Sequence, residues 1–466
     1  MQVINQKWRG YVGNRAFYST ALQVMIPIAI QQLINNLFNM VDNIMVGSLD
    51  TSGLAIAAVN VANKPYLIFF GLVFGVTGGA GLLISQYYGN NQRQTCQRLF
   101  SLQIWIVLLF STIFFILLRF FPRNIMTLFV DNEQTIEMGI AYMDILAYTF
   151  LPAGISSTVM FSMRALGINR ISMIVSMATM GINVFFNYAL IFGKLGFPEM
   201  GIVGAALGTL IARVCEMTFY IFILFSKKTV FSFDFFAFLA LPKQIFKDFF
   251  SKCIPLVINE IFWTTGLNLY FWSYSHINES ALPAITIADI CYQISAILAI
   301  GMSSAVSVML GTALGANRLK EVKESTKKLF GLTLCIGVCS LVFCIAIGYI
   351  LPLFFDISPE LKQLATKMAI ISGLFAPFSH VYSFCFCCLR AGGDTKNALL
   401  LDSGYMWFVP VPVSVCVAIF FGKHIDIITA FIIVQVLMNA KVFFAVHIVK
   451  QKKWIRNITI NGEKST

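Results

Sequence analysis

The chain has 466 residues, of which 58% are hydrophobic and only 12% are charged, and its mean hydropathy is +0.80. Ordinary soluble domains contain roughly 25% charged residues, so a composition this apolar excludes a soluble fold. The apolar runs are continuous rather than alternating, which argues against a β-barrel. The composition therefore predicts an all-α membrane protein.

Twelve apolar runs follow one another along the chain, and each is long enough to cross a bilayer core about 30 Å thick. The predicted transmembrane helices cover residues 17–45, 54–84, 99–121, 136–161, 171–193, 201–225, 249–273, 281–310, 329–353, 364–388, 397–421 and 427–449. The first run is too long for a signal peptide and lacks a small-residue cleavage site, so we expect it to be retained.

The Lys and Arg residues on the two sides of the predicted spans are unevenly distributed. If the N-terminus is inside, the two tails and the loops after spans 2, 4, 6, 8 and 10, counted with the adjoining span ends, carry 24 of the 33 basic residues. The six opposite loops, counted in the same way, carry 6. An excess of basic residues marks the cytoplasmic side of a membrane protein. We therefore expect both termini to be cytoplasmic. The net charge of +12 then follows from topology rather than from nucleic-acid binding.

Two motifs recur at a constant separation in the two halves of the chain. Gly89 has a counterpart in Gly315, and Arg164 has one in Arg390, both 226 residues further on. A constant offset indicates that one unit was duplicated, here a bundle of six membrane helices. We expect the two glycines to allow tight cytoplasmic turns and the two arginines to anchor helix ends at the level of the lipid headgroups.

The duplication divides the chain into an N-lobe at 1–226, a cytoplasmic linker at 227–248 and a C-lobe at 249–466 that ends in a short cytoplasmic tail. Paired bundles of membrane helices usually hold a substrate site, which favours transport. The chain contains neither a Gly-x-x-x-x-Gly-Lys-Ser/Thr loop nor a His-Glu-x-x-His motif, the marks of nucleotide hydrolysis and of zinc proteolysis. We therefore expect a transporter without enzymatic activity that uses an ion gradient or is passive.

Charged side chains inside the spans cost at least about 2.5–3.5 kcal/mol each in hydrocarbon, so each should face protein or water. Arg213 and Glu216 are three residues apart on one helix and are expected to pair. Acids outnumber bases, so some carboxylates lack an evident basic partner and can take up a proton or hold Na⁺. Such ion occupancy is the physical basis of an ion-coupled antiporter. The residues concerned are Asp42, Asp144, Glu216, Glu260, Asp289, Asp402, Lys64, Arg213 and Lys441.

Asp42 is the predicted coupling residue. Asn35, Asn39 and Asp42 lie at offsets of 0, 4 and 7, so they share one face of the first helix and form a polar stripe. The alternative is that Asp42 only caps the outer end of this helix. A simple cap does not require amides one and two turns below it, so we favour ion coupling, with Na⁺ as one ion that Asp42 could bind and Asn35 and Asn39 available to substrate or proton.

Glu260 is the predicted substrate-binding or proton-binding acid of the second half. It lies roughly twelve residues into its span, near the middle of the bilayer by the 1.5 Å rise per residue. Trp263 is one turn away, and an acid beside an aromatic ring suits an organic cation. The alternative is a structural ion pair with Lys441 or Lys64.

The remaining candidates carry weaker signals. Asp289 and Asp402 stay open between substrate or proton binding and a structural role, whereas we expect Asp144 to be structural. His380 lies inside a span, where a structural histidine is favoured over a pore-lining one. The eleven cysteines show no spacing typical of a metal site.

Several segments resemble a known family. Val41–Gly47 (VDNIMVG) is similar to the first-span signature of multidrug and toxic compound extrusion (MATE) transporters. Further similar segments, in the family's order over essentially the whole chain, are Gln86–Gly89, Arg164–Gly167, Asn183–Gly193, Gly201–Thr209, Leu310–Ala316 and Leu389–Lys396. The resemblance implies two six-helix lobes in a V-shaped architecture. It also implies efflux of amphipathic, often cationic compounds in exchange for Na⁺ or H⁺.

The resemblance further implies roles for individual residues. Asp42 matches the cation-site aspartate of the N-lobe, Asn183 matches its asparagine partner, and Thr209 matches a hydroxyl ligand in span 6. Asn187 falls where some relatives have a second aspartate, so that carboxylate is absent here. These four residues are the implied cation-coupling set.

In the second half, Glu260 matches the span 7 glutamate of the NorM-like branch of this family. That branch often has a further acid in span 10, and the corresponding segment here, Ser379–Tyr382, contains none. Both the identity of the coupling ion and the existence of a separate cation site in the C-lobe therefore stay open.

Two other transporter classes are alternatives. A major-facilitator-type transporter normally carries an Asp-Arg-x-Gly-Arg-like cluster after span 2, and the loop here, SQYYGNNQRQTCQR, has no acid. A lipid-intermediate flippase of the wider superfamily often has a strongly cationic cavity, and the excess of intramembrane acids speaks against it.

The expected partners are small organic substrates and the lipid bilayer, with neither nucleic acid nor an obligate protein partner. No cofactor is expected beyond Na⁺ or H⁺ as the coupling ion. The expected location is a bacterial plasma (inner) membrane, which the chain crosses many times.

Overall fold

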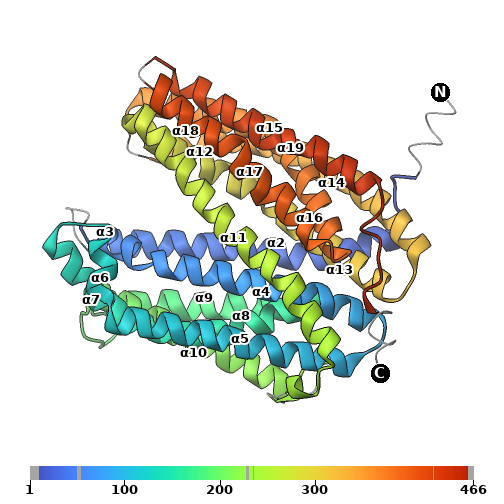
Figure 1. Cartoon of the computed structure of the whole chain (residues 1–466). Coiled ribbons are helices and arrows are strands. Elements are labelled where there is room, and N and C mark those ends of the chain that lie inside the picture. Colours follow the sequence, from blue (N-terminus) through green and yellow to red (C-terminus); the bar gives the residue numbers. More distant parts are fainter. Residues whose placement is uncertain are drawn as a thin grey trace. The chain divides into compact units, whose positions relative to one another are not determined.

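The computed structural model describes residues 10–49, 54–226, 230–232, 234, 236–355, 357–422 and 424–459, apart from the side chains of residues 39, 40, 43 and 44. These residues form helices and turns, with no strand among them (Figure 1). A helix satisfies its own backbone N–H and C=O groups, which a segment in lipid must do because no water is available to it.

The first half of the chain contains α2 (Arg15–Gly47), α3 (Leu54–Ala62), α4 (Lys64–Gly89), α5 (Arg93–Phe120), α6 (Pro122–Thr127), α7 (Glu133–Leu146), η1 (Ala147–Thr149), α8 (Phe150–Ala165), α9 (Asn169–Ile191), α10 (Gly201–Phe225) and η2 (Ala237–Ala240). The second half contains α11 (Lys243–Ile277), η3 (Glu279–Ala281), α12 (Leu282–Ser295), α13 (Ile297–Gly315), α14 (Leu319–Ile350), η4 (Leu351–Phe354), α15 (Pro359–Ala391), α16 (Thr395–Leu399), η5 (Leu400–Gly404), α17 (Tyr405–Phe408), α18 (Pro410–Phe421) and α19 (Ile427–Lys450).

Each predicted span coincides with one helix or with a run of consecutive helices. Within the described part of the chain, eleven such stretches are long and apolar enough to cross a membrane. The seventh predicted span coincides with α11, which has 35 residues but is less apolar because it carries Asn259, Glu260 and Asn268. Its length still exceeds the roughly 20 residues that a bilayer requires.

Local chemistry explains many helix boundaries. Asn132, Ser358 and Asp426 are the N-caps of α7, α15 and α19, and each side chain accepts a hydrogen bond from a backbone N–H in the first turn. Two predicted spans are interrupted near prolines, between α3 and α4 beside Pro65 and between α17 and α18 beside Pro410. Proline interrupts a helix because it has no N–H to donate.

The described residues fall into two compact units. Unit 1 comprises the described parts of Met1–Ala29, Ser85–Asn91 and Ile254–Thr466, and unit 2 those of Ile30–Ile84 and Gln92–Cys253. Helices α2 and α11 belong partly to each unit, and the division falls close to their internal prolines, Pro27 and Pro255. The lobe boundaries at 226 and 249 stay a prediction.

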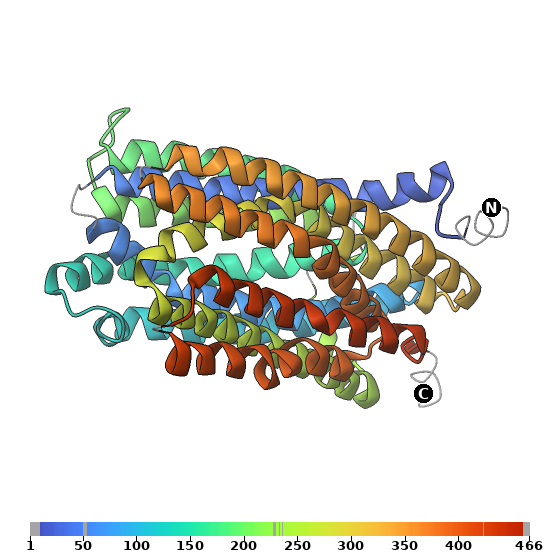
Figure 2. The ribbon, with the colours of Figure 1, turned by 90° about the horizontal axis from the view of Figure 1, so that it is seen from above.

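Packing within each unit follows a few dominant helix pairs. In unit 2, α9 packs along α10, α5 packs along α8, and α3 packs against α7. In unit 1, α15 is the central helix, because α12, α13, α14 and α19 all pack against it. Figure 2 shows the same helices from above.

The repeated glycines lie at the ends of α4 and α13, both within unit 1. A Cβ atom at Gly89 would collide with the backbone oxygen of Thr312, and one at Gly315 would collide with that of Gln86. Glycine is therefore needed at both positions because the two helix ends approach each other closely.

The expectation that these glycines form the cytoplasmic turns is wrong. The residues with positive φ in the turns that follow are Asn91 (58°) and Asn317 (56°). Asparagine tolerates this left-handed conformation better than most residues. The duplicated motif thus combines a glycine for close helix contact with an asparagine for the turn.

The repeated Arg164 does more than anchor a helix end. Its guanidinium donates to Oε1 of Gln31 at 2.5 Å and lies 5.1 Å from the centroid of the Phe161 ring. Gln31 in turn donates to Oγ of Ser176 at 2.6 Å. Arg164 therefore ties α8 to α2 and α9 inside unit 2.

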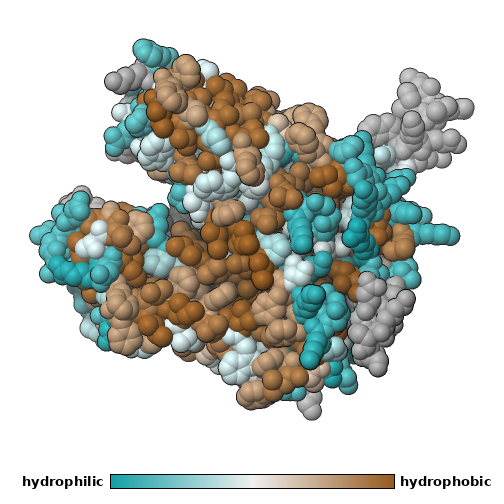
Figure 3. Space-filling model, in the orientation of Figure 1, coloured by the Kyte–Doolittle hydropathy of each residue, from teal (hydrophilic) through white to brown (hydrophobic). Residues whose placement is uncertain are grey.

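Large apolar side chains cover the outside of the helices. Phe408, Phe420 and Phe443 are 83%, 72% and 73% exposed. On the visible face of each unit, apolar residues cover the middle of the helices and hydrophilic residues gather at their ends (Figure 3). A surface this apolar is unfavourable in water and suits lipid tails. The protein is therefore a helical membrane protein that crosses the bilayer several times.

Candidate functional site

Asp42 lies inside α2, five residues before this helix ends at Gly47. The interpretation of Asp42 as a simple helix cap is therefore wrong. Its Oδ1 atom accepts a hydrogen bond of 2.5 Å from Nδ2 of Asn187 on α9. The coupling residue predicted from the sequence thus contacts a second residue of the predicted set.

A chain of hydrogen bonds continues from this contact through unit 2. Asn187 also donates to Oδ1 of Asn183 at 2.9 Å, and Asn183 donates to Oγ1 of Thr209 on α10 at 3.4 Å. Asn183 and Asn187 are four residues apart and so share one face of α9. The structure therefore brings all four predicted cation-coupling residues together, on α2, α9 and α10.

The close approach of α10 to α9 completes this site. A Cβ atom at Gly208 would collide with Oδ1 of Asn187, so a larger residue there would displace the Asn187 side chain. Asn187 is 1% exposed, and its Oδ1 atom has no hydrogen-bond partner within the described part of the chain. An unsatisfied buried acceptor costs about 1–3 kcal/mol, which a bound cation or water would offset. Carboxylate and amide oxygens are the ligands that hard cations prefer.

The basic residue whose charge acts on Asp42, Arg213, has another partner. Arg213 donates to Oε2 of Glu216 at 2.8 Å, which confirms the predicted pair. Its charge also acts on Asp42, but the salt bridges found among the described residues do not include Asp42. Asp42 is thus bound to an amide rather than to a permanent cation.

Of the two other asparagines of the predicted stripe, the structure describes the side chain of Asn35. Asn35 is exposed and takes no part in the hydrogen-bond chain. The side chain of Asn39 lies outside the described residues, so its predicted role stays a prediction.

A second polar cluster lies in unit 1. Nζ of Lys441 on α19 is 2.8 Å from Oδ1 of Asp402, and Nδ2 of Asn259 on α11 donates to Oδ2 of Asp402 at 3.0 Å. All three residues are buried, with Lys441 at 4% exposed and Asp402 at 7%. Burial of an ion pair is costly unless the remaining polar atoms are also bonded, and Asn259 meets that need for Asp402.

An irregular helix segment positions this acid. Asp402 lies in η5, a π-helical turn, and its neighbour Ser403 also reaches α11. Oγ of Ser403 donates to Oδ1 of Asn259 at 2.8 Å. Two consecutive residues of this turn, Asp402 and Ser403, thus both bond to Asn259. Such turns are frequent at functional sites.

Two aromatic rings face the ammonium group of Lys441. Nζ lies 3.9 Å from the centroid of the Tyr382 ring and 4.8 Å from that of the Trp263 ring. Both distances are within the range of cation–π attraction. We call the group that surrounds this ammonium the Asp402 site. It consists of Asp402, Asn259, Trp263 and Tyr382.

Glu260 lies next to Asn259 and is half-buried. The alternative ion pair of Glu260 with Lys441 or Lys64 is not found. Lys441 binds Asp402, and Lys64 is exposed. The charges of Arg390 and Asp402 act on Glu260. The salt bridges of the described residues do not include Glu260.

The other intramembrane candidates lie apart from these clusters. Asp289 on α12 is exposed and does not join the bonds of the Asp402 site. Asp144 pairs with Arg119 at 3.0 Å, in agreement with the expected structural role. His380 is buried and lines a small pocket.

Sequence reasoning missed Tyr382 and Ser403. Tyr382 belongs to the segment Ser379–Tyr382, which was noted in the sequence only for its lack of an acid. Ser403 follows Asp402 directly in the sequence. A residue adjacent to an intramembrane acid usually faces away from it on a helix, so no periodic pattern could have indicated Ser403. The ring of Tyr382 could have been suspected only from its position in a span.

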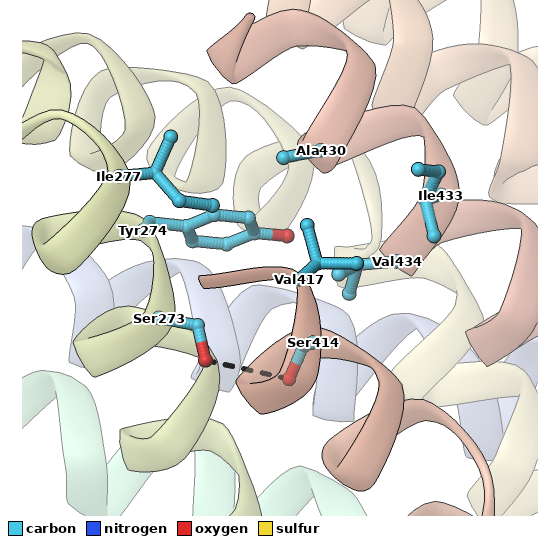
Figure 4. A pocket seen from close by; sticks show the side chains of 8 residues that line it. All are labelled: Ser273, Tyr274, Ile277, Ser414, Val417, Ala430, Ile433 and Val434. Carbon is cyan, nitrogen blue, oxygen red and sulfur yellow. Dashed lines mark hydrogen bonds between the residues drawn. The ribbon is translucent and has the colours of Figure 1, made fainter. Parts of the chain in front are cut away.

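A small pocket between α11, α18 and α19 is separate from the charged residues of unit 1 (Figure 4). Ser273 and Ser414 face each other at its edge at 3.4 Å between their Oγ atoms, and the ring of Tyr274 lines it. Every residue that lines it is uncharged.

Comparison with known proteins identifies the family. The MatE family model matches residues 27–189 and again residues 255–415. The chain belongs to the MatE family. The two matches lie one in each half, as the predicted duplication requires. The matched residues of this MatE protein include Asp42 and Asp402, whereas Lys441 lies outside them.

Relatives of this MatE protein are similar over most of its length. A probable multidrug resistance protein NorM from Thermotoga maritima is 23% identical over 402 residues, which cover 84% of each chain. Another of the same name from Bacillus anthracis is 22% identical over 403 residues, which cover 85% of this chain and 87% of that protein.

Solved structures show the same fold. A mutant of the MATE transporter VcmN from Vibrio cholerae matches with a TM-score of 0.84 and 16% identity, over 95% of this chain and 100% of that one. A MOP superfamily transporter from Pyrococcus furiosus matches with a TM-score of 0.82 and 16% identity, over 93% and 95% of the two chains. The two-lobed, all-helical MATE fold predicted from the sequence is confirmed.

Proposed function

We propose that this MatE protein exports amphipathic, often cationic organic compounds in exchange for Na⁺ or H⁺ across a bacterial plasma membrane. The observation that carries the proposal is the hydrogen-bond chain from Asp42 through Asn187 and Asn183 to Thr209. The similarity to proteins named as probable multidrug resistance proteins supports organic compounds as the cargo.

The chain of hydrogen bonds is suited to sense a small cation. A proton would bind the Asp42 carboxylate, and Na⁺ would bind the oxygens of Asp42, Asn187 and Thr209. Either ion removes the cost of a charge in a low-dielectric surrounding. Cation occupancy therefore changes the interactions among α2, α9 and α10, and this difference is what an exchanger uses to favour one conformation over another.

The energy for export would come from the ion gradient. Moving one charge through a membrane potential of 100 mV releases about 2.3 kcal/mol. If one cation binds Asp42 from outside and is released inside, this free energy becomes available to expel the cargo. Na⁺ and H⁺ are both compatible with a carboxylate surrounded by amide and hydroxyl oxygens.

In unit 1, Glu260 and Trp263 lie one turn apart on α11 and are candidates for contact with cationic cargo. Glu260 is half-buried, and Trp263 already lies against an ammonium group. Asp289 and Asp402 are further acids that could bind cargo or protons. The presence of carboxylates and aromatic rings favours cationic compounds over anionic ones.

Transport in proteoliposomes tests the proposal. The purified protein would be reconstituted, and Na⁺ and pH gradients would be imposed separately while uptake of a fluorescent organic cation is followed. We expect Asp42→Asn to abolish gradient-driven transport, because the amide cannot bind either ion as the carboxylate does. Asp144→Asn is the matched control, since that acid belongs to a separate, surface ion pair. Normal transport by Asp42→Asn would contradict the proposal.

A further inference from the structure

The Asp402 site has the composition of a binding site for an ammonium group. It offers one carboxylate oxygen at 2.8 Å, the faces of two aromatic rings, and an amide that holds the second carboxylate oxygen. Charge-assisted hydrogen bonds and cation–π contacts are the two interactions by which proteins recognise alkylammonium ligands. The group that occupies this site is the side chain of Lys441.

An ion pair that serves only stability does not require two aromatic rings around its ammonium group. Buried ion pairs are weak stabilisers, because the cost of desolvation offsets most of the attraction. Lysine also differs from arginine here, since its compact ammonium group sits on a flexible stem and does not hold a carboxylate in a fixed bidentate geometry. The ammonium group of Lys441 can therefore move away from the Asp402 carboxylate.

A second carboxylate lies on the face of α11 that Lys441 already touches. Glu260 is three residues before Trp263, so the two side chains are neighbours on the helix surface, and the Lys441 ammonium lies against the Trp263 ring. The charges of Glu260 and Asp402 act on each other. A displaced ammonium group could thus pair with Glu260 instead of being left buried without a partner.

We propose that the Asp402 site is an ammonium-binding site in which Lys441 is the resident occupant, and that an organic ammonium cargo enters by displacing Lys441 toward Glu260. This inference deepens the proposed function and rests on it for the nature of the cargo. It gives Lys441 the role of a tethered competitor, which lowers the apparent affinity for every cation that uses the site.

The first experiment tests the site without transport. Lys441→Ala removes three carbons and the ammonium group beyond Cβ, and n-propylammonium replaces those atoms. In detergent, we expect n-propylammonium to raise the Tm of Lys441→Ala by a few degrees in a saturable manner, because a ligand that binds only the folded state stabilises it. The neutral 1-propanol should have no such effect, and neither compound should stabilise the wild-type protein, whose site is filled.

The control for this experiment is Asp402→Asn/Lys441→Ala, which keeps the space but lacks the carboxylate. It should not respond to n-propylammonium. An equal response to 1-propanol, or an undiminished response of the double variant, would overturn the proposal.

The second experiment tests displacement and applies even if Lys441→Ala does not fold. Affinity for ethidium, an aromatic cation, would be measured by fluorescence for Lys441→Met. Removal of the resident competitor should tighten binding by about tenfold, whereas a purely structural role predicts unchanged or weaker binding, which would refute the inference. Glu260→Gln should weaken binding more in the wild-type background than in Lys441→Met, because only the wild-type protein has a displaced lysine that needs Glu260 in addition to the cargo.

The proposed function and the inference about Lys441 can fail separately. If wild-type protein in proteoliposomes does not transport ethidium under any ion gradient, the proposed function is contradicted, while the n-propylammonium result still decides whether the site accepts an ammonium group. If transport occurs but Lys441→Met binds ethidium no more tightly, only the inference about Lys441 is lost.

Discussion

Asn187 donates a hydrogen bond to Asp42 from a position 145 residues away in the sequence, and this contact joins α9 to α2. It leaves the carboxylate bonded to a neutral group, so its negative charge stays available to a mobile ion. A bond to arginine or lysine in its place would neutralise the carboxylate permanently. The identity of residue 187 therefore bears directly on the proposed ion coupling.

Asn187→Leu should uncouple transport. Leucine has a similar size but can neither donate to Asp42 nor offer an oxygen to a cation, so we expect gradient-driven uptake in proteoliposomes to fall at least about tenfold, as for the loss of about 1.4 kcal/mol of binding. Asn35→Leu is the control, because Asn35 is exposed and outside the hydrogen-bond chain. Equal activity of the two variants would count against the site.

Gly208→Ala should damage both stability and transport. The added methyl group would overlap Oδ1 of Asn187, and overpacking of a well-packed region typically costs about 1–3 kcal/mol. The control is Gly181→Ala on α9, where a Cβ atom meets nothing within 4 Å. There the loss of glycine flexibility should leave stability equal or raise it by about 0.5–1 kcal/mol. Thermal unfolding in detergent would separate the two outcomes.

Asp402→Asn should be destabilising, because it removes the carboxylate that the buried Lys441 ammonium binds. Breaking a buried pair costs about 3–5 kcal/mol when the remaining charge has no new partner, and pairing of Lys441 with Glu260 would reduce that loss. The double variant Asp402→Asn/Lys441→Met should recover most of that loss, since both charges are gone. The measurement is the thermal unfolding temperature of the three proteins, and a double variant no more stable than the single one would show that charge pairing is not the cause.

Gly315→Ala should destabilise the contact between the ends of α4 and α13. Its methyl group would meet the backbone of Gln86, which cannot move aside as a side chain can. Asn317→Gly is the informative control, because glycine adopts the positive φ of 56° at this position at least as readily as asparagine. We expect a lower unfolding temperature for the first variant and little change for the second.

Both termini should be cytoplasmic. Peptide tags placed at either end should be inaccessible to an impermeant label in intact cells and accessible after the membrane is opened. A cysteine in the loop between α5 and α7 on the opposite side serves as the positive control. Labelling of either terminal tag from outside would contradict the charge distribution on which the topology rests.

Much of the fold was predictable because it depends on local properties of the chain. Span limits follow from runs of apolar residues, and the pair of Arg213 and Glu216 follows from their separation of three positions on one helix. The four predicted cation-coupling residues were indicated by family position, and the structure brings them together. They are Asp42, Asn183, Asn187 and Thr209. Their hydrogen-bond pattern, however, depends on how closely α10 approaches α9 at Gly208.

The partner of each intramembrane charge was not predictable in the same way. Lys441 could have paired with Glu260 or Asp402, which lie on different helices, and the sequence offers no rule for choosing between them. The π-helical turn η5 adds a rotation that the regular helical period does not contain. The prediction that Gly89 and Gly315 form turns was wrong because a glycine can serve either a turn or a close helix contact, and the sequence does not distinguish the two.

The amino-acid sequence by itself determined that this chain is a duplicated bundle of membrane helices with acids within its spans. Hydropathy, charge asymmetry and repeat spacing are properties of the chain that do not depend on how its helices are arranged. Only the tertiary structure decided that Asp42 binds an amide while Asp402 binds Lys441. The energy of a buried charge depends on which groups lie within a few ångströms of it, and those neighbours come from helices far apart in the sequence.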